Sequence, residues 1–364
     1  MLVDVIAGAR PNFMKVTPII EQIRAFKAAG HNINYRLVHT GQHYDHNMSE
    51  SFFRQLNIPM PDINLEVGSG SQGEQAGNII IKYEQVLLDK PADLTLVVGD
   101  VTSTMACSIA AKKLQIKIAH VEGGIRSFDL SMPEEINRMV TDSITDYFFT
   151  TSHTANQNLL KSGIDEKNIF FVGNTMIDTL LKNMNRLSKP AIFDELQLQE
   201  REYFVLTLHR PNNVDEGDNL KRLISEIVIN VNGLPIIFPV HPRTAKNLAS
   251  LGINHPNLYY TEPMGYLEFN YMVKNAKAVI TDSGGITEET TVMAVPCITL
   301  RNNTERPETV TVGTNELVGT NPDAIKPALE KLFSGQWKKG AVPELWDGKT
   351  SERIVAAICR LFGV

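Results

Sequence analysis

Short apolar runs alternate along the chain with longer segments whose apolar residues recur at helical spacing. Leu2 to Ala7 predicts a strand, 8–12 a turn, and 13–29 a helix that ends before Gly30. Further apolar runs predict more strands that each lead into a turn. They are Leu94 to Val98, Ile116 to Val121, Val205 to Leu208, Ile236 to Val240, Ala278 to Thr281 and Ile298 to Leu300. Strands that alternate with helices predict an α/β fold with parallel sheets covered on both faces.

The length of 364 residues suits two domains, because a single core seldom grows beyond about 250 residues. A boundary signal lies at 172–174, and the following stretch over 187–202 is polar and charged before a second set of strands begins. We therefore expect an N-terminal domain over 1–172 and a C-terminal domain over 173–350. The amphipathic segment over 351–364 could return to the first domain, which the sequence leaves open.

Composition narrows the classes of function. A net charge of −6 without a basic block argues against a nucleic-acid partner, because phosphate backbones are met by clustered Lys and Arg. No apolar run has the length of a membrane span, and the N-terminus lacks the pattern of a signal peptide, so we expect a cytoplasmic protein that does not bind membranes. The widely spaced Cys107, Cys297 and Cys359 indicate buried free thiols, with neither a disulfide framework nor a zinc site.

Polar residues follow the carboxyl ends of the predicted strands, where open parallel sheets bind ligands: Arg10, Asp100, Glu122, His209, His241 and Ser283. The turn Ser283-Gly284-Gly285 joins a strand to a helix, and the free amides at a helix N-terminus suit a phosphate. Backbone geometry is the alternative reason for such glycines.

Two cations stand at the first predicted turn. Arg10 can bind a phosphate through two guanidinium nitrogens, and the ammonium group of Lys15 adds a second positive charge. The helix dipole disfavours cations at this end, so a bound anion explains them better than a surface position does.

Acids and histidines are the candidates for proton transfer. Asp100, Glu122 and the pair Glu134-Glu135 would raise each other's pKa if they converged in one cleft. The alternatives are a helix cap for Asp100 and a favourable first-turn position for either glutamate. His209 and His241 suit proton donation at neutral pH, and without a third nearby ligand they predict no metal.

Motifs in collinear order over about residues 3–320 resemble the non-hydrolysing UDP-N-acetylglucosamine 2-epimerase family. They are Gly-Ala-Arg-Pro-Asn-Phe-Met-Lys at 8–15, Thr-Gly-Gln-His-Tyr-Asp at 40–45, Val-Gly-Asp at 98–100, His-Val-Glu-Gly-Gly-Ile-Arg at 120–126, Pro-Glu-Glu-Ile-Asn-Arg at 133–138, Val-Gly-Asn-Thr-Met-Ile-Asp at 172–178, Leu-His-Arg at 208–210, Pro-Val-His-Pro at 239–242, Asp-Ser-Gly-Gly-Ile-Thr-Glu-Glu at 282–289 and Thr-Glu-Arg-Pro-Glu at 304–308.

The resemblance implies two Rossmann-like domains that face a central cleft in the GT-B arrangement, in a homodimer without a cofactor. It implies interconversion of UDP-GlcNAc and UDP-ManNAc through 2-acetamidoglucal, for precursors of surface polysaccharide. The residues that match the family's catalytic positions are Asp100, Glu122, Glu134 and His209. Those that match positions binding the UDP-sugar are Arg10, Lys15, Met264, Phe269, Ser283, Gly284, Gly285, Glu289 and Arg306.

Some positions depart from the family pattern. Gln42-His43-Tyr44-Asp45 and Arg210-Pro211-Asn212 differ from the motifs of members that UDP-GlcNAc activates, which puts an activator site in doubt. A modified UDP-HexNAc, either 6-deoxy or a diacetamido uronate, is therefore an alternative substrate. A GT-B glycosyltransferase is a further alternative that three acids in one cleft fit poorly.

Overall fold

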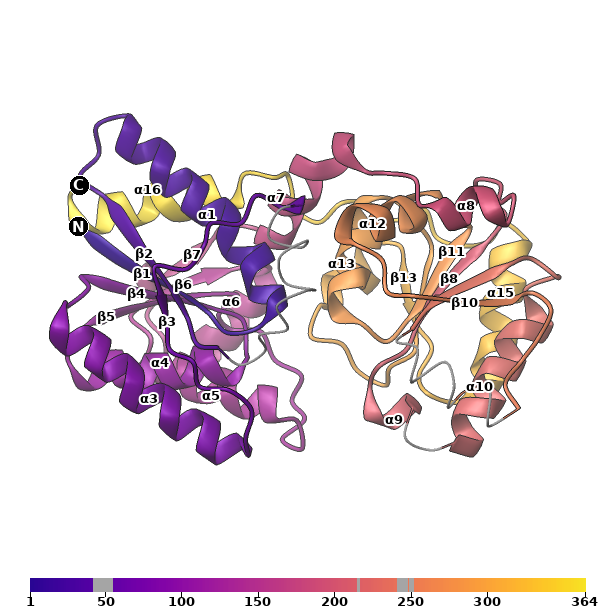
Figure 1. Cartoon of the computed structure of the whole chain (residues 1–364), viewed down its shortest axis with the longest axis horizontal. Coiled ribbons are helices and arrows are strands. Elements are labelled where there is room, and N and C mark those ends of the chain that lie inside the picture. The colour runs from indigo at the N-terminus through magenta and orange to yellow at the C-terminus, as the bar shows by residue number, and fades with distance from the viewer. Residues whose placement is uncertain (42–54, 215–216, 241–247, 249–251) are drawn as a thin grey trace. The chain divides into compact units, whose positions relative to one another are not determined.

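A computed structural model describes residues 1–41, 55–214, 217–240, 248 and 252–364, and the chain forms two compact units (Figure 1). The first unit comprises Met1–Lys182 and Glu344–Val364, and the second comprises Asn183–Pro343. The sequence had placed the divisions at 172/173 and 350/351. In the structure the Thr179 hydroxyl donates to the Met14 carbonyl at 2.6 Å, and the buried Trp346 indole donates to the Thr151 carbonyl at 3.2 Å. These contacts tie both flanking segments to the first unit.

The first unit is built on a seven-stranded parallel sheet in the described part of the chain. In sheet order its strands are β3 (Ile63–Asn64), β2 (Asn34–His39), β1 (Leu2–Ala7), β4 (Leu94–Val98), β5 (Lys117–Val121), β6 (Tyr147–Thr150) and β7 (Ile169–Phe171). Every residue of β4 is buried, as expected for a central strand covered on both faces. The order reverses between β1 and β4, which makes that point the switch point of this sheet.

Helices cover both faces of this sheet (Figure 1). They are α1 (Arg10–Ala28), α3 (Gln72–Asp89), α4 (Thr102–Lys113), α5 (Pro133–Ile144), α6 (His153–Lys161), α7 (Thr175–Asn183) and α16 (Thr350–Phe362), with a short 3-10 turn at Glu166–Asn168. The C-terminal α16 packs beside α1. Its first amides, those of Thr350 and Ser351, donate to the Asp178 carboxylate of α7 at 3.1 and 2.7 Å. An acid from another helix thus caps α16.

Among its described residues, the second unit contains a six-stranded parallel sheet with the same kind of order. Its strands are β10 (Leu258–Thr261), β9 (Ile236–Pro239), β8 (Phe204–Thr207), β11 (Ala278–Thr281), β12 (Cys297–Thr299) and β13 (Asn315–Leu317). The order reverses between β8 and β11. Its helices are α8 (Ala191–Glu195), α9 (Pro211–Val214), α10 (Gly217–Asn230), α12 (Tyr266–Asn275), α13 (Gly284–Val292), α14 (Pro307–Thr311) and α15 (Ile325–Phe333), with 3-10 turns at Met184–Arg186 and Pro322–Ala324.

An apolar core joins the sheet of the second unit to α10 and α15, which lie on one face, while α12 and α13 lie on the other (Figure 1). The predicted α/β class with two Rossmann-like parallel sheets is confirmed. The three cysteines are free and buried, as predicted. Among the described residues no helix is long and apolar enough to cross a membrane.

Candidate functional site

Each sheet brings predicted site residues to its own switch point. In the first unit, Arg10 follows β1 and Asp100 follows β4. In the second unit, His209 follows β8 and Ser283 follows β11. Crevices at this edge are the usual ligand sites of open α/β sheets, since two neighbouring turns diverge there. Two candidate half-sites result, one in each unit.

The turn after β1 carries the predicted cations. Its amides at Gly8 and Ala9 donate to the Asn12 side chain at 3.1 and 3.0 Å, and α1 begins at Arg10. The Arg10 side chain lies outside the described residues, as do His241 and the motif at 42–45. Lys15 was predicted to bind phosphate. In the structure its ammonium lies 2.8 Å from Glu122 Oε2.

Glu122 is held at the end of β5 in an uncommon backbone conformation. Its φ is +71°, a left-handed value that costs a residue with a side chain roughly 1–3 kcal/mol. The side chain is only 4% exposed and pairs with Lys15. Gly99 lies against this pair, since a Cβ there would stand 3.5 Å from Lys15 Nζ and 3.6 Å from Glu122 Oε2. Strain of this kind is typical of functional sites.

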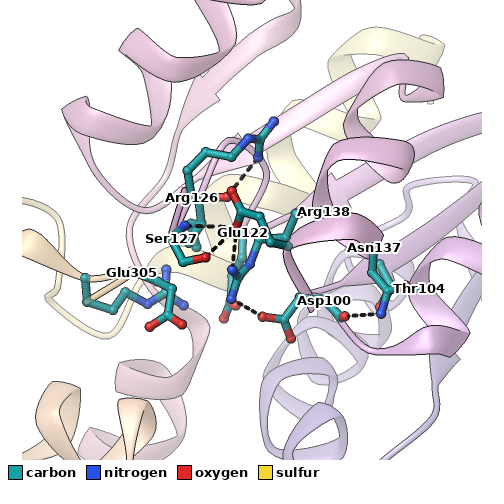
Figure 2. Close-up of polar contacts among 12 residues, drawn as sticks. Asp100, Thr104, Glu122, Arg126, Ser127, Asn137, Arg138 and Glu305 are labelled. Atoms are coloured by element: carbon teal, nitrogen blue, oxygen red, sulfur yellow. Dashed lines mark hydrogen bonds and ion pairs between the residues drawn. The ribbon is translucent and has the colours of Figure 1, made fainter. Parts of the chain in front are cut away.

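Asp100 is bound by two residues of α5, as Figure 2 shows. Arg138 Nη2 lies 2.5 Å from Asp100 Oδ2, and the Asn137 amide donates to the Asp100 carbonyl at 2.8 Å. The N-cap of α4 is Val101, so Asp100 does not cap the helix in the way its sequence position also allowed. Its carboxylate is 30% exposed and stands beside a guanidinium. It is therefore accessible for proton transfer.

The two adjacent glutamates of α5 differ in their surroundings. Glu135 is buried and accepts hydrogen bonds from the Ser127 amide at 2.9 Å and the Phe128 amide at 3.1 Å. Burial raises the pKa of Glu135, but these amides and Arg138 outweigh it and hold the pKa below its ordinary value. Glu134 is half-buried in the first turn. Glu135 therefore holds the loop that precedes α5, and Glu134 remains the candidate for proton transfer.

His209 of the second unit is tied to Asp282, which is fully buried at the end of β11. His209 Nδ1 lies 2.7 Å from Asp282 Oδ1, and the amide of Arg210 and the side-chain nitrogen of Asn213 donate to Oδ2 at 2.9 and 3.0 Å. Burial raises the pKa of Asp282, but its hydrogen bonds outweigh burial and keep the pKa low. A carboxylate only accepts, so Nδ1 carries a proton and Nε2 is left for a ligand.

The predicted phosphate turn begins a helix, as the sequence indicated. Ser283 is the N-cap of α13 without a side-chain capping bond, and Gly284 and Gly285 are the first helical residues. All three are half-buried. A Cβ at Gly284 would lie 3.9 Å from Nη1 of Arg301, whose buried guanidinium pairs with Glu305 at 2.7 Å. The turn thus combines helix amides with a nearby cation.

Glu289 lies buried within α13. Its Oε1 accepts from the Tyr266 hydroxyl at 2.8 Å and from the Asn270 amide at 3.4 Å. Burial raises the pKa of Glu289 to about 7, against the effect of these two donors and with a contribution from the charge of Glu288. The predicted uracil neighbours Met264 and Phe269 are half-buried, just before and within α12.

Arg306 was predicted to contact the ligand, and the structure gives it a partner on α13. Its Nε pairs with Glu288 Oε1, and both side chains are buried. Arg306 is also the N-cap residue of α14, which follows the Glu-Arg-Pro motif. Its charge therefore bears on the position of α13 as well as on any ligand.

Several residues of these half-sites were not singled out from the sequence. Asp282 and Arg138 lie inside motifs that the sequence displays, so their motif positions were the available signal. Arg301 follows the strand β12 and had only its strand-end position to mark it. Within the described ranges, no three His, Cys, Asp or Glu side chains are grouped as a metal site requires.

Comparisons with known proteins agree on one family. The family model described as UDP-N-acetylglucosamine 2-epimerase matches residues 25–359. The UDP-N-acetylglucosamine 2-epimerase of Methanocaldococcus jannaschii is 44% identical over 98% of both chains. The UDP-2,3-diacetamido-2,3-dideoxy-D-glucuronate 2-epimerase of Pseudomonas aeruginosa is 38% identical over 99% of this chain and 100% of that one. A crystal structure of the M. jannaschii UDP-GlcNAc 2-epimerase with UDP-GlcNAc and UDP has a TM-score of 0.86 at 42% identity, covering 99% of this chain and 100% of that one.

Proposed function

Because the chain belongs to the UDP-N-acetylglucosamine 2-epimerase family, we propose that it interconverts UDP-GlcNAc and UDP-ManNAc. The observation that carries the proposal is the pair of switch points, one with Asp100 and Glu122 nearby and one with His209 and the turn at Ser283. The first half-site supplies carboxylates for proton transfer. The second supplies amides for a diphosphate.

The proposed reaction passes through an elimination. The C2 proton of the sugar is not acidic enough for direct exchange, so a carboxylate removes it while the C1–O bond breaks. The C2–H electrons form the C1–C2 double bond of 2-acetamidoglucal, and UDP leaves with the C1–O electron pair. UDP then adds back to C1 while C2 is protonated on the opposite face. Asp100, Glu122 and Glu134 are the acids for these proton transfers.

The second unit is proposed to hold the nucleotide throughout. The amides at Ser283, Gly284 and Gly285 would bind the diphosphate, together with the predicted ligands Arg10, Lys15 and Arg306. Glu289 would accept from the ribose hydroxyls, and Met264 and Phe269 would enclose the uracil. Negative charge grows on UDP as the C1–O bond breaks, so these donors act mainly on the transition state.

His209 is the proposed acid for the departing phosphate oxygen. Asp282 holds Nδ1 at 2.7 Å, which orients the ring and turns Nε2 away from this carboxylate. Nε2 would then donate a proton or a hydrogen bond to the oxygen on which charge develops. When UDP returns, the same nitrogen would accept that proton back.

Incubation with UDP-GlcNAc in deuterated water tests the proposal. UDP-ManNAc with deuterium at C2 is the expected product, identified by NMR and mass spectrometry. A matched sample of Glu122→Gln should give little product. Release of free ManNAc would indicate a hydrolysing enzyme instead, and unlabelled product or none would contradict the elimination.

A modified UDP-HexNAc is a second candidate substrate, favoured by the 38% identity to the P. aeruginosa diacetamido-glucuronate epimerase. A panel of UDP-GlcNAc, its 6-deoxy analogue and the diacetamido uronate would decide between the substrates by kcat/KM. A tenfold or greater preference for the uronate or the deoxy sugar would favour this second candidate.

A further inference from the structure

Helix α5 buries polar residues and exposes apolar ones, the reverse of an ordinary surface helix. Ile136 and Met139 are 43% and 47% exposed. The buried side chains of α5 are all polar: Glu135, Asn137, Arg138, Thr141 and Asp142. Of its apolar residues, Ile144 packs against the apolar core of the first unit. The fully buried face of α5 is held by polar contacts with the strand ends.

Asp142, near the end of α5, gathers three of these contacts on one carboxylate. Oδ1 lies 2.7 Å from His120 Nδ1. Oδ2 accepts the Gly124 amide at 3.1 Å and lies 2.6 Å from Arg126 Nη1. Burial raises the pKa of Asp142, but His120 and Arg126 outweigh burial and lower it. The carboxylate is thus an ionised, buried acceptor.

His120 extends this contact to the strand β4. Its side chain is fully buried, and Nε2 lies 2.8 Å from the Gly99 carbonyl. A carbonyl and an ionised carboxylate only accept, so His120 donates from both ring nitrogens, from Nε2 to Gly99 and from Nδ1 to Asp142. Through His120, Asp142 therefore holds the residue that precedes Asp100.

The contacts of Asp142 also fall on both sides of Glu122 in the chain, at His120 and Gly124. Between them Glu122 adopts its φ of +71°, with its amide donating to the Phe149 carbonyl at 2.9 Å. A strained residue keeps such a conformation only where its surroundings determine it. The bonds at 120 and 124 supply that constraint.

We propose that Asp142 and His120 are positioning residues that set the carboxylate of Glu122 for proton transfer at C2 of the sugar. The proposal rests on the proposed function. Neither residue needs to touch the substrate, since Asp142 acts on the two sides of Glu122 through the His120 side chain and the Gly124 amide. Because hydrogen bonds hold Glu122 in this proposal, catalysis would depend on the hydrogen-bond donors and acceptors at residue 142 more than on the charge of that residue.

The test is the kcat of Asp142→Ala and Asp142→Asn in the full-length protein, with KM and the affinity for UDP. Asp142→Ala should lower kcat at least tenfold with UDP affinity within twofold of wild type. Asp142→Asn should recover most of the loss, because its amide oxygen can accept from Gly124 and Arg126, and its NH2 can donate to His120 Nδ1 in the neutral Nε2–H tautomer. Little difference between the alanine variant and wild type would overturn the proposal.

Asp146, which lies between α5 and β6, provides a control because its carboxylate contacts the same strand, β5. Asp146 accepts the Ile118 amide at 2.9 Å and pairs with Lys112 and Lys117, but at the amino end of β5. Asp146→Ala removes a comparable set of contacts, so we expect it to lower thermal stability while kcat stays within twofold. A tenfold fall in the kcat of Asp146→Ala would mean that any loss of contacts to β5 impairs catalysis, and it would overturn the specific role of Asp142.

A double-mutant cycle separates positioning from general damage. If Asp142 acts through Glu122, Asp142→Ala should have little further effect on kcat in a Glu122→Gln background. Full multiplication of the two losses would refute the proposal. His120→Gln, measured in the same cycle, serves if Asp142→Ala does not fold. Wild type without epimerase activity would instead refute the proposed function, which keeps the two failures distinct.

Discussion

The buried carboxyl of Glu289 should make stability depend on pH near neutrality. Burial raises its pKa to about 7, whereas a glutamate in the unfolded chain titrates near 4.5. Between these values the unfolded chain gives up a proton that the folded protein keeps. The free energy of unfolding therefore falls as pH rises through this window. A difference of about 2.5 units corresponds to about 3.4 kcal/mol in total.

Glu289→Gln removes this titration while keeping the side-chain shape and an acceptor for Tyr266. Relative to wild type, the variant should become more stable as pH rises, by about 2.5 kcal/mol between pH 5 and pH 8. Urea unfolding of both proteins at four pH values measures the difference. Low-pKa carboxylates such as Asp282 are common to both proteins, so their contribution cancels.

An exposed glutamate of the same unit provides the control. Glu330 on α15 is 65% exposed, so Glu330→Gln should follow the wild-type pH dependence closely. Parallel stability curves for wild type and Glu289→Gln would refute the reasoning, because they would show that folding does not shift the protonation of Glu289.

Three further predictions concern the two half-sites and the fold. Asp100→Asn and Glu122→Gln should each lower turnover by roughly a hundredfold or more, because proton transfer is lost. Calorimetry should still detect UDP binding to both variants. Wild-type turnover in either variant would reject the catalytic role of that residue. Asp282→Asn should lower kcat roughly tenfold or more, because the asparagine NH2 can donate to Nδ1 and so change the tautomer of His209. A wild-type kcat would contradict this. Gly173→Ala should lower the free energy of unfolding by more than about 1 kcal/mol. The reason is that φ of Gly173 is +104° and a Cβ there would lie 2.2 Å from the Leu345 carbonyl oxygen. An unchanged melting temperature would contradict this prediction.

Strands with continuous apolar runs were predictable from the sequence. The runs at 2–7, 94–98 and 278–281 became β1, β4 and β11 at the same residues. β2 (Asn34–His39) was missed, and it carries a charged residue, Arg36, in its middle. In the structure Arg36 is buried and forms two hydrogen bonds of 2.7 Å to Asp4 of β1. Only the pairing of the two strands provides that partner.

The sequence indicated which residue types of the candidate site lie at strand ends. It did not indicate which of these residues contact one another. Lys15 lies 107 positions from its partner Glu122, and His209 lies 73 from Asp282. Helix α5 was predictable only from its Pro-Glu-Glu motif, since its buried face is polar. A periodic pattern reports which side chains share a face, and it carries no information about the partner that faces them.

The sequence by itself determined the parallel α/β class, the strand-end positions of the acids and histidine, and a helix after the turn Ser283-Gly284-Gly285. These follow from local chemistry: apolar runs, helical spacing and the conformational needs of short turns. The tertiary structure decided which charges meet, that Asp282 orients His209, and that Asp142 holds both flanks of Glu122. Such contacts depend on the order of strands in the sheet, which brings together residues far apart in the chain.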